Sequence, residues 1–198
     1  TLDDAVLEGT ETFTVSLSAS DPSVTDSDTG TGTITDNDSA ALTVSDVSAA
    51  EGSGLLFTVT LDNAVQGGFN VAVTLTDITA IGGAGPLVTP EDYNDVVAAL
   101  NFAGTAGETQ QFTVSTLDDA VLEGNETFSV SLSASDPLVT DSDTGTGTIT
   151  DNDGAALTVG DVSAAEGSGL VFTVMLDNDV AGPFSVSVTL SDVSAIGG

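Results

Sequence analysis

The sequence predicts an all-β protein built from tandem repeats of 115 residues. Apolar residues alternate with Thr and Ser along many short segments, as in strands with one buried face. Residues 1–38 recur at 116–153 with 35 of 38 positions identical, and residues 154–198 match 39–83 at 33 of 45 positions. A period of this length is typical of an array of whole domains and too long for the unit of a solenoid.

The repeat divides the chain into three segments. Residues 39–153 form one complete repeat, residues 1–38 are the end of a preceding repeat, and residues 154–198 are the start of a following one. Each flank supplies only part of a sandwich, so we expect residues 39–153 to fold alone and the flanks not to. We also expect the chain to be part of a longer protein, because it has no initiator Met.

Strand patterns divide the complete repeat into seven predicted strands, separated by stretches of Asp, Asn, Gly and Pro. Alternation is clear at Phe57, Val59 and Leu61, for example. Seven short strands in a domain of this size favour a Greek-key β-sandwich of two sheets, immunoglobulin-like in architecture. The strands are expected at residues 41–45, 55–61, 70–76, 96–102, 110–116, 127–134 and 145–150.

The composition excludes several classes of function. The chain has 31 acidic residues and no Lys, Arg or His, so its net charge of -31 repels nucleic acids and anionic membranes. Without His, Cys or Lys there is no usual base for a serine nucleophile, no thiol and no Schiff base, and we expect no enzyme. A sugar site usually offers aromatic platforms, but here there is no Trp and only one Tyr, Tyr93, which is predicted to be a packed aromatic at the edge of a strand.

Acidic residues concentrate at one end of the predicted sandwich. If successive strands alternate in direction, the odd-numbered strands end at the same pole, and the segments that follow them hold 12 of the 17 acidic residues of the complete repeat. Two carboxylates about 5 Å apart repel by roughly 3 kcal/mol at an effective dielectric constant of about 20. A pole of this kind either takes up protons or binds a cation.

Calcium is the expected cation. Carboxylate oxygens select hard cations, and calcium accepts about six to eight of them in flexible geometry, whereas magnesium keeps its waters. We therefore expect two or more Ca²⁺ ions in the complete repeat. A plainer interpretation of residues 151–153 is a turn whose Asp and Asn side chains bond their own backbone. Asp141 and Asp143 fall at the opposite pole and are interpreted as a solvated hairpin.

Several motifs stand out among the acidic residues. The pair Asp118 and Asp119 is followed by Glu123, then by Glu126-Thr-Phe, and finally by a terminal Asp151-Asn-Asp. Glu51-Gly-Ser-Gly and Asp92-Tyr come earlier in the same repeat. Together these motifs resemble a Calx-beta domain. The resemblance covers the complete repeat and both partial ones. It implies a β-sandwich of the kind found in sodium-calcium exchangers, integrin β4 and large bacterial surface proteins.

The resemblance also implies a set of calcium ligands. Asn152 departs from the family, because an acid stands there in its strongest calcium binders. The matching positions in the complete repeat are Glu51, Asp92, Asp118, Asp119, Glu123, Glu126, Asp151 and Asp153. The partial repeats carry the equivalent residues Asp3, Asp4, Glu8, Glu11, Asp36, Asp38 and Glu166.

These observations predict a calcium-binding structural repeat that stiffens a large extracellular or cell-surface protein, adhesin-like and bacterial. Its partners would be the neighbouring repeats of the same chain, and the adhesion partner is left open. Two alternatives come from other classes. A calcium-sensing regulatory domain would need an attached membrane protein, and a carbohydrate-binding module would need an aromatic platform.

Overall fold

The computed structural model describes residues 2–193. Thr1 and residues 194–198, the outer ends of the first and third predicted segments, lie outside the described residues. Two compact units are distinguished, residues 1–118 with 125–150, and residues 119–124 with 151–198. Every helix or strand assigned in residues 2–193 is a β-strand, which confirms the all-β class. That part of the chain holds no helix long and apolar enough to cross a membrane.

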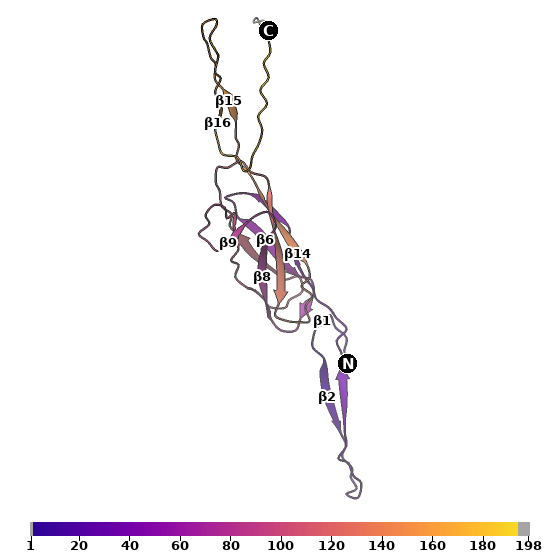
Figure 1. The fold of residues 1–198 in the computed structure, drawn as a ribbon. Coiled ribbons are helices and arrows are strands. Elements are labelled where there is room, and N and C mark those ends of the chain that lie inside the picture. Colours follow the sequence, from indigo (N-terminus) through magenta and orange to yellow (C-terminus); the bar gives the residue numbers. More distant parts are fainter. Residues whose placement is uncertain (1, 194–198) are drawn as a thin grey trace. The chain divides into compact units, whose positions relative to one another are not determined.

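The complete repeat forms a sandwich of two sheets (Figure 1). Its main strands are β4 (Leu42–Val44), β5 (Val47–Ala50), β6 (Leu55–Leu61), β8 (Phe69–Asp77), β11 (Leu100–Phe102), β12 (Thr109–Val114), β13 (Glu126–Ala134) and β14 (Thr144–Thr150). The larger sheet has the order β11-β8-β13-β14-β5, and the smaller sheet has the order β12-β6-β4. All pairs are antiparallel except β14 with β5, which are parallel.

Aromatic side chains join the two sheets in the core. Phe57 of β6 stacks on Phe112 of β12 with ring centroids 5.1 Å apart, and it meets Phe128 of β13 across the sandwich at 6.0 Å. Phe128 in turn stacks on Tyr93 at 4.2 Å. Tyr93 is fully buried, so it is packed, as predicted, but it belongs to the core and not only to a strand edge, and it offers no platform to a sugar.

Each of the seven predicted segments overlaps an observed strand, and β6 has the predicted bounds. The fourth prediction, 96–102, is wrong in its first half, because β11 covers only Leu100–Phe102. Asn94 accounts for the late start: its Oδ1 accepts a hydrogen bond from the Val96 N–H at 2.9 Å, which turns the chain and leaves Val96 exposed. Polar side chains of this kind compete locally with a sheet ladder.

Strand β5 lies where the sequence suggested only a loop, residues 46–54. Its residues pair with β14 in the register Ala50↔Thr150, so the chain passes from the smaller sheet in β4 to the larger sheet in β5. The Asp46 carboxylate helps by accepting the Thr146 N–H at 2.7 Å. The partners of this ladder are about one hundred positions apart in the sequence, so no local pattern announces the pairing.

Carboxylates outside the predicted calcium set hold loop backbone in place. Asp141 accepts the Ala134 N–H and Asp143 accepts the Val44 N–H, both at 2.8 Å. The interpretation of this pair as a merely solvated hairpin was therefore wrong. Each carboxylate satisfies a backbone donor that the sheet ladders leave over.

Glu108 gathers several backbone donors in the same way, which leads to a pH-dependent prediction. Its carboxylate accepts the N–H groups of Ala103, Gly104 and Thr105 at 2.9 to 3.3 Å. The bond from Ala103 lowers the pKa of Glu108 most, burial opposes the shift, and the Gln110 side chain and the other two N–H groups add to it. A lowered native pKa means stability that is present above the pKa of the unfolded chain and is lost as the pH falls through the native pKa.

We expect Glu108→Gln to lower the free energy of unfolding by about 1 kcal/mol at neutral pH, the scale of a modest hydrogen-bond loss. The difference should vanish as the pH falls through the native pKa, which lies below the ordinary value for glutamate. Denaturant unfolding of both proteins over a series of pH values measures it. A difference that stays the same at all pH values would contradict the role of the charged carboxylate.

The flanking segments form short ladders that expose most of their side chains. In residues 1–38, β2 (Glu11–Ser16) pairs with β3 (Thr29–Ile34), and in the third segment β15 (Leu157–Val159) pairs with β16 (Val174–Leu176), both antiparallel. Every residue of β2, β15 and β16 is exposed. A further strand, β1 (Val6–Leu7), pairs in parallel with β7 (Ala64–Val65) of the complete repeat.

Candidate calcium site

Backbone hydrogen bonds bring the ends of three strands together in the complete repeat. The Glu51 N–H donates to Thr150 O at 3.1 Å, just beyond the last register pair of β5 with β14. The Gly52 N–H donates to Leu117 O at 3.1 Å, and the Leu117 N–H donates to Asp92 O at 2.9 Å. Segments that are far apart in the sequence therefore place Glu51, Asp92 and Asp118 in one neighbourhood.

Gly52 is required at this junction. Its φ of +71° is a conformation that residues with a side chain rarely adopt. A Cβ at this position would also lie 2.7 Å from the Cβ of Asp118. The glycine thus lets the turn after β5 pass directly against Asp118.

Asp151 organises the acidic loop that precedes β13. Its two carboxylate oxygens accept the N–H groups of Glu123 and Asp153, each at 2.9 Å. Asp119 accepts the Val121 N–H at 2.8 Å within the same loop. The Asp151–Asp153 segment therefore does contain the backbone-bonded turn of the plainer interpretation, and the turn fixes where Glu123 and Asp153 lie.

Residues 1–38 repeat this arrangement 115 positions earlier. Asp36 accepts the N–H groups of Glu8 and Asp38 at 2.7 and 3.0 Å, and Asp4 accepts the Val6 N–H at 3.0 Å. The two copies of this sequence therefore form the same loop contacts. All six predicted ligands of this segment line one pocket of about 50 Å³, namely Asp3, Asp4, Glu8, Glu11, Asp36 and Asp38.

Repulsion among the carboxylates in that pocket affects their pKa values. Burial and then repulsion from Asp4 raise the pKa of Glu8, with Glu11, Asp36 and Asp38 adding to the shift. Burial and then repulsion from Asp36 raise the pKa of Asp38. The hydrogen bond from the Glu8 N–H lowers the pKa of Asp36. Asp36 therefore loses its proton more readily than Glu8 and Asp38, whose pKa values are raised.

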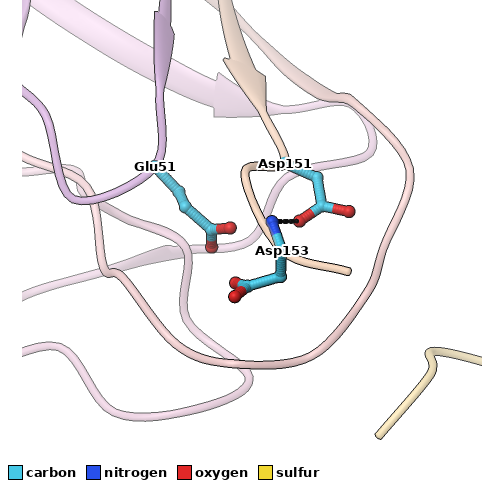
Figure 2. A group of neighbouring side chains, drawn as sticks. All are labelled: Glu51, Asp151 and Asp153. Carbon is cyan, nitrogen blue, oxygen red and sulfur yellow. Dashed lines mark hydrogen bonds between the residues drawn. The ribbon is translucent and has the colours of Figure 1, made fainter. Parts of the chain in front are cut away.

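Six of the eight predicted ligands of the complete repeat form two groups. In each group, one carboxylate oxygen per residue lies within 4.8 Å of the others. Figure 2 shows the first group, Glu51, Asp151 and Asp153, with the hydrogen bond that joins the last two. The second group is Asp92, Glu123 and Glu126.

Asp153 carries the observation that a cation fits here. Its Oδ2 is buried and accepts no hydrogen bond from any of residues 2–193. A buried carboxylate oxygen is costly unless a proton, a donor or a metal compensates it. Oxygen donors gathered in this way, with no nitrogen or sulfur among them, match the preference of calcium.

The remaining predicted ligands lie outside the two groups. Asp118 lies against Gly52, and Asp119 bonds its own loop. Glu166 is exposed in the third segment. Asn37, the equivalent of Asn152, donates from its Nδ2 to Asp3 at 3.2 Å, so an amide here occupies a carboxylate oxygen instead of supplying one.

Two other acids of the same pole serve their own loop. The Tyr93 hydroxyl donates to Asp77 Oδ1 at 2.6 Å, and the Gly82 N–H donates to the same oxygen at 2.9 Å. Burial raises the pKa of Tyr93, and the bond to Asp77 adds to the shift, so the phenol stays protonated as a donor. Glu91 accepts the Val88 N–H at 3.1 Å.

Sequence reasoning missed an apolar residue inside the acidic loop. Leu7, in β1, is 6% exposed, and its carbonyl accepts the Gln66 N–H at 2.8 Å. Its equivalent Leu122 bridges to Val180, receives the Ala181 N–H at 2.9 Å and donates to Asp179 O at 3.0 Å. The acidic loop of one repeat therefore joins the next repeat through a leucine. The signal was an apolar Ala-Val-Leu run between two acids, present in both copies.

Comparison with known proteins gave one family and several solved structures. The profile of the Calx-beta domain family matches residues 1–47 and 34–153. Calx-beta domains are known as calcium-binding modules. No curated protein matches the chain.

Three solved structures are similar at low identity. The apo-form Calx CBD1 domain is 17% identical, with a TM-score of 0.46 over 59% of this chain and 100% of that one. CBD12 from CALX1.2 is 19% identical, with a TM-score of 0.46 over 60% of this chain and 49% of that one. The calcium binding domain CBD12 of CALX1.1 is 19% identical, with a TM-score of 0.44 over 58% and 44%. This chain spans about half the length of the two CBD12 structures.

Proposed function

Because the chain belongs to the Calx-beta domain family, we propose that it is a calcium-binding structural repeat that stiffens a large extracellular surface or adhesin-like protein. The observation that carries the calcium assignment is the buried Oδ2 of Asp153, which has no donor among residues 2–193 and belongs to a group of three carboxylates. A calcium ion would supply the missing positive charge.

Each group of carboxylates would hold at least one ion. Glu51, Asp151 and Asp153 form the first set, and Asp92, Glu123 and Glu126 form the second, so two or more ions per complete repeat are proposed. Each carboxylate oxygen of Asp151 already accepts one hydrogen bond from the loop backbone, and these bonds orient the loop before a cation binds. Preorganised ligands lose less entropy on binding.

The finer architecture of the proposal is a tandem array of Greek-key sandwiches with a period of 115 residues. The recurrence of the same hydrogen bonds around Asp36 and Asp151 supports it, as does the recurrence of the leucine joint at Leu7 and Leu122. The larger sheet also places strands side by side that are distant in the sequence, such as β8 and β13. Neighbours of this kind are consistent with Greek-key connections.

Stiffening would arise because one loop serves both the ion and the next repeat. In residues 4–8, Leu7 is packed on the complete repeat, while the adjacent Glu8 lines the acidic pocket and its N–H is held by Asp36. Without a cation the clustered carboxylates repel and strain this loop. A bound ion would hold the loop and so fix the docked leucine.

The setting follows from charge. A chain of net charge -31 has no affinity for nucleic acid or for an anionic membrane. Mutual repulsion between such negatively charged chains keeps them soluble. We place it outside the cell or on the cell surface, in a bacterial protein, where its partners are neighbouring repeats. Its contribution is reach and orientation, with no catalytic role.

Calcium titration of the 198-residue chain tests the proposal directly. Isothermal calorimetry should show binding of two or more ions, with little response to magnesium at the same concentration. The double variant Glu51→Gln and Asp153→Asn should lose at least one of these binding events. Undetectable calcium binding by the unaltered chain, at millimolar free calcium, would sink the proposal.

The stiffening mechanism has its own test in the same chain, which has no native cysteine to interfere with labelling. Spin labels at Thr12→Cys and Thr74→Cys, both exposed strand positions, report the joint between residues 1–38 and the complete repeat. We expect calcium to narrow the distance distribution and Leu7→Asp to broaden it even with calcium, because a charged side chain cannot occupy the buried position.

The matched control is Val24→Asp, which adds the same charge to the same segment at a residue that is 55% exposed and does not line the acidic pocket. It should behave like the unaltered chain. If calcium binds without narrowing the distribution of distances between the spin labels, the ion stabilises only its own loop, and the stiffening mechanism is contradicted.

A further inference from the structure

A glutamine side chain of the complete repeat reaches the acidic loop of the preceding segment. The Gln66 Nε2 donates a hydrogen bond to Glu8 Oε1 at 3.0 Å. Glu8 is one of the six predicted calcium ligands that line the acidic pocket of residues 1–38. One carboxylate oxygen of a predicted ligand is therefore held by a residue of the repeat that follows the pocket.

The backbone of Gln66 is fixed on both sides, so its side chain starts from a defined place. Val65 is 5% exposed, and its N–H donates to Gly104 O at 3.0 Å. The Gln66 N–H donates to the carbonyl of Leu7, which precedes Glu8 in the chain, at 2.8 Å. The parallel pair β1–β7 thus brings the two side chains together, and the glutamine amide adds a contact beyond the ladder.

The second joint of the chain repeats these backbone contacts without the amide. Ala181 stands 115 positions after Gln66, and its N–H donates to Leu122 O at 2.9 Å. The glycine that follows has a φ of +86° in both copies. The two joints therefore share these backbone features. They differ in that Ala181 has no side-chain donor to offer Glu123, the equivalent of Glu8.

A hydrogen bond to one carboxylate oxygen affects how the other oxygen meets a cation. It restricts the rotation of the carboxylate, so the side chain loses less entropy when an ion binds. It also partly compensates the charge of Glu8, which shares the pocket with five other carboxylates. Hydrogen-bond partners of metal ligands typically change metal affinity by about 10- to 100-fold. We expect the lower end here, because Gln66 is exposed and water competes for the same bond.

We propose that Gln66 is a positioning residue for the calcium site of the preceding repeat, so that the affinity of one repeat for calcium is set by the repeat that follows it. This proposal rests on the calcium-binding function proposed above. The coupling is reciprocal: if docking of Gln66 raises the affinity of the acidic loop for calcium, calcium strengthens the docking by the same factor. A joint with Gln66 is then more responsive to calcium at this contact than a joint with Ala181.

Nuclear magnetic resonance separates the two loops in one calcium titration of the 198-residue chain. The backbone amide of Gly9, which lines the first pocket, reports calcium at Glu8, and the amide of Gly124 reports calcium at the equivalent loop. Gln66→Ala should weaken the calcium midpoint at Gly9 by about 10-fold and leave the midpoint at Gly124 unchanged. In the unaltered chain, the side-chain amide signal of Gln66 should shift with the same midpoint as Gly9.

Gln111→Ala is the matched control. Gln111 is also an exposed glutamine whose Nε2 donates at 3.0 Å, but it donates to Thr58 Oγ1, and neither residue lines the acidic pocket. This variant should leave both midpoints unchanged. Gln66→Ala keeps the backbone N–H that donates to Leu7, so the ladder of the first joint has all its donors in the variant too.

Ala181→Gln is the converse variant, made at the second joint. It supplies the amide that this joint lacks, so it should strengthen the calcium midpoint at Gly124 and leave that at Gly9 unchanged. Single substitutions are needed because the native joints differ elsewhere as well: Asp179 stands where the first joint has Ala64. An unchanged midpoint at Gly124 in Ala181→Gln would contradict a role for this position in every joint.

The titration separates failure of this proposal from failure of the calcium-binding function. Equal midpoints at Gly9 in the unaltered chain and in Gln66→Ala would overturn the positioning role and leave calcium binding in place. A calcium response at Gly124 without one at Gly9 overturns it as well, because Glu8 would then hold no ion. If neither amide responds to millimolar calcium, the calcium-binding function fails and this proposal fails with it.

Discussion

Phe128→Ala should lower the free energy of unfolding of the complete repeat by about 3–5 kcal/mol, the range for removing a large core aromatic. Phe128 is fully buried and lies between two other rings, stacked on Tyr93 at 4.2 Å and tilted against Phe57 at 6.0 Å. Truncation removes the ring contacts and leaves a cavity between the two sheets. The loss is a large fraction of the free energy of unfolding of a typical domain, about 5–15 kcal/mol, so the variant should unfold at a lower temperature.

The repeat supplies a matched control for this change. Phe13→Ala makes the same substitution at the equivalent position of the first flank, where the ring is 52% exposed. It should leave the main unfolding transition unchanged. Denaturant unfolding followed by circular dichroism measures both. Equal losses for the two variants would show that residues 1–38 belong to the same cooperative unit and would contradict the prediction that residues 39–153 fold alone.

Calcium should stabilise the complete repeat by roughly 2.7 kcal/mol when free calcium is about 100 times its dissociation constant. The gain follows from binding to the native arrangement of carboxylates, which the unfolded chain does not hold together. Glu51→Gln with Asp153→Asn should abolish most of the gain. The same double variant should be at least as stable as the unaltered chain in chelator, because it removes two repelling charges, one of them on Asp153, whose Oδ2 has no donor among residues 2–193.

Asp141→Asn is the control for this experiment. It removes a carboxylate that accepts the Ala134 N–H and stands in neither acidic group, so it should lower stability with and without calcium and leave the calcium-dependent difference intact. Thermal melts in calcium, magnesium and chelator give the comparison. Identical melting temperatures in all three solutions would rule out the calcium site.

Strand positions could be predicted wherever burial leaves a local trace. In β6 the side chains alternate between the core and the outer face, and the predicted bounds match those observed. The prediction was wrong where a single side chain overrode the pattern: Asn94 turns the chain at Val96 and delays β11. It also missed β5, because parallel pairing with β14 depends on residues about one hundred positions away. Alternation is a local property, whereas sheet partners are chosen by the whole fold.

For the acidic residues, the sequence alone determined the kind of chemistry and the approximate place. A chain without cations, with acids recurring every 115 residues, must satisfy gathered carboxylates with protons, backbone donors or a metal. Only the tertiary structure decided which acid takes which role. Asp77 and Glu91 bond their own loop, Asp151 holds the loop backbone, and Asp153 keeps an oxygen with no donor among residues 2–193. The reason is that a carboxylate's role depends on which N–H groups and charges lie within about 3–5 Å of it in space, and sequence spacing does not specify those neighbours.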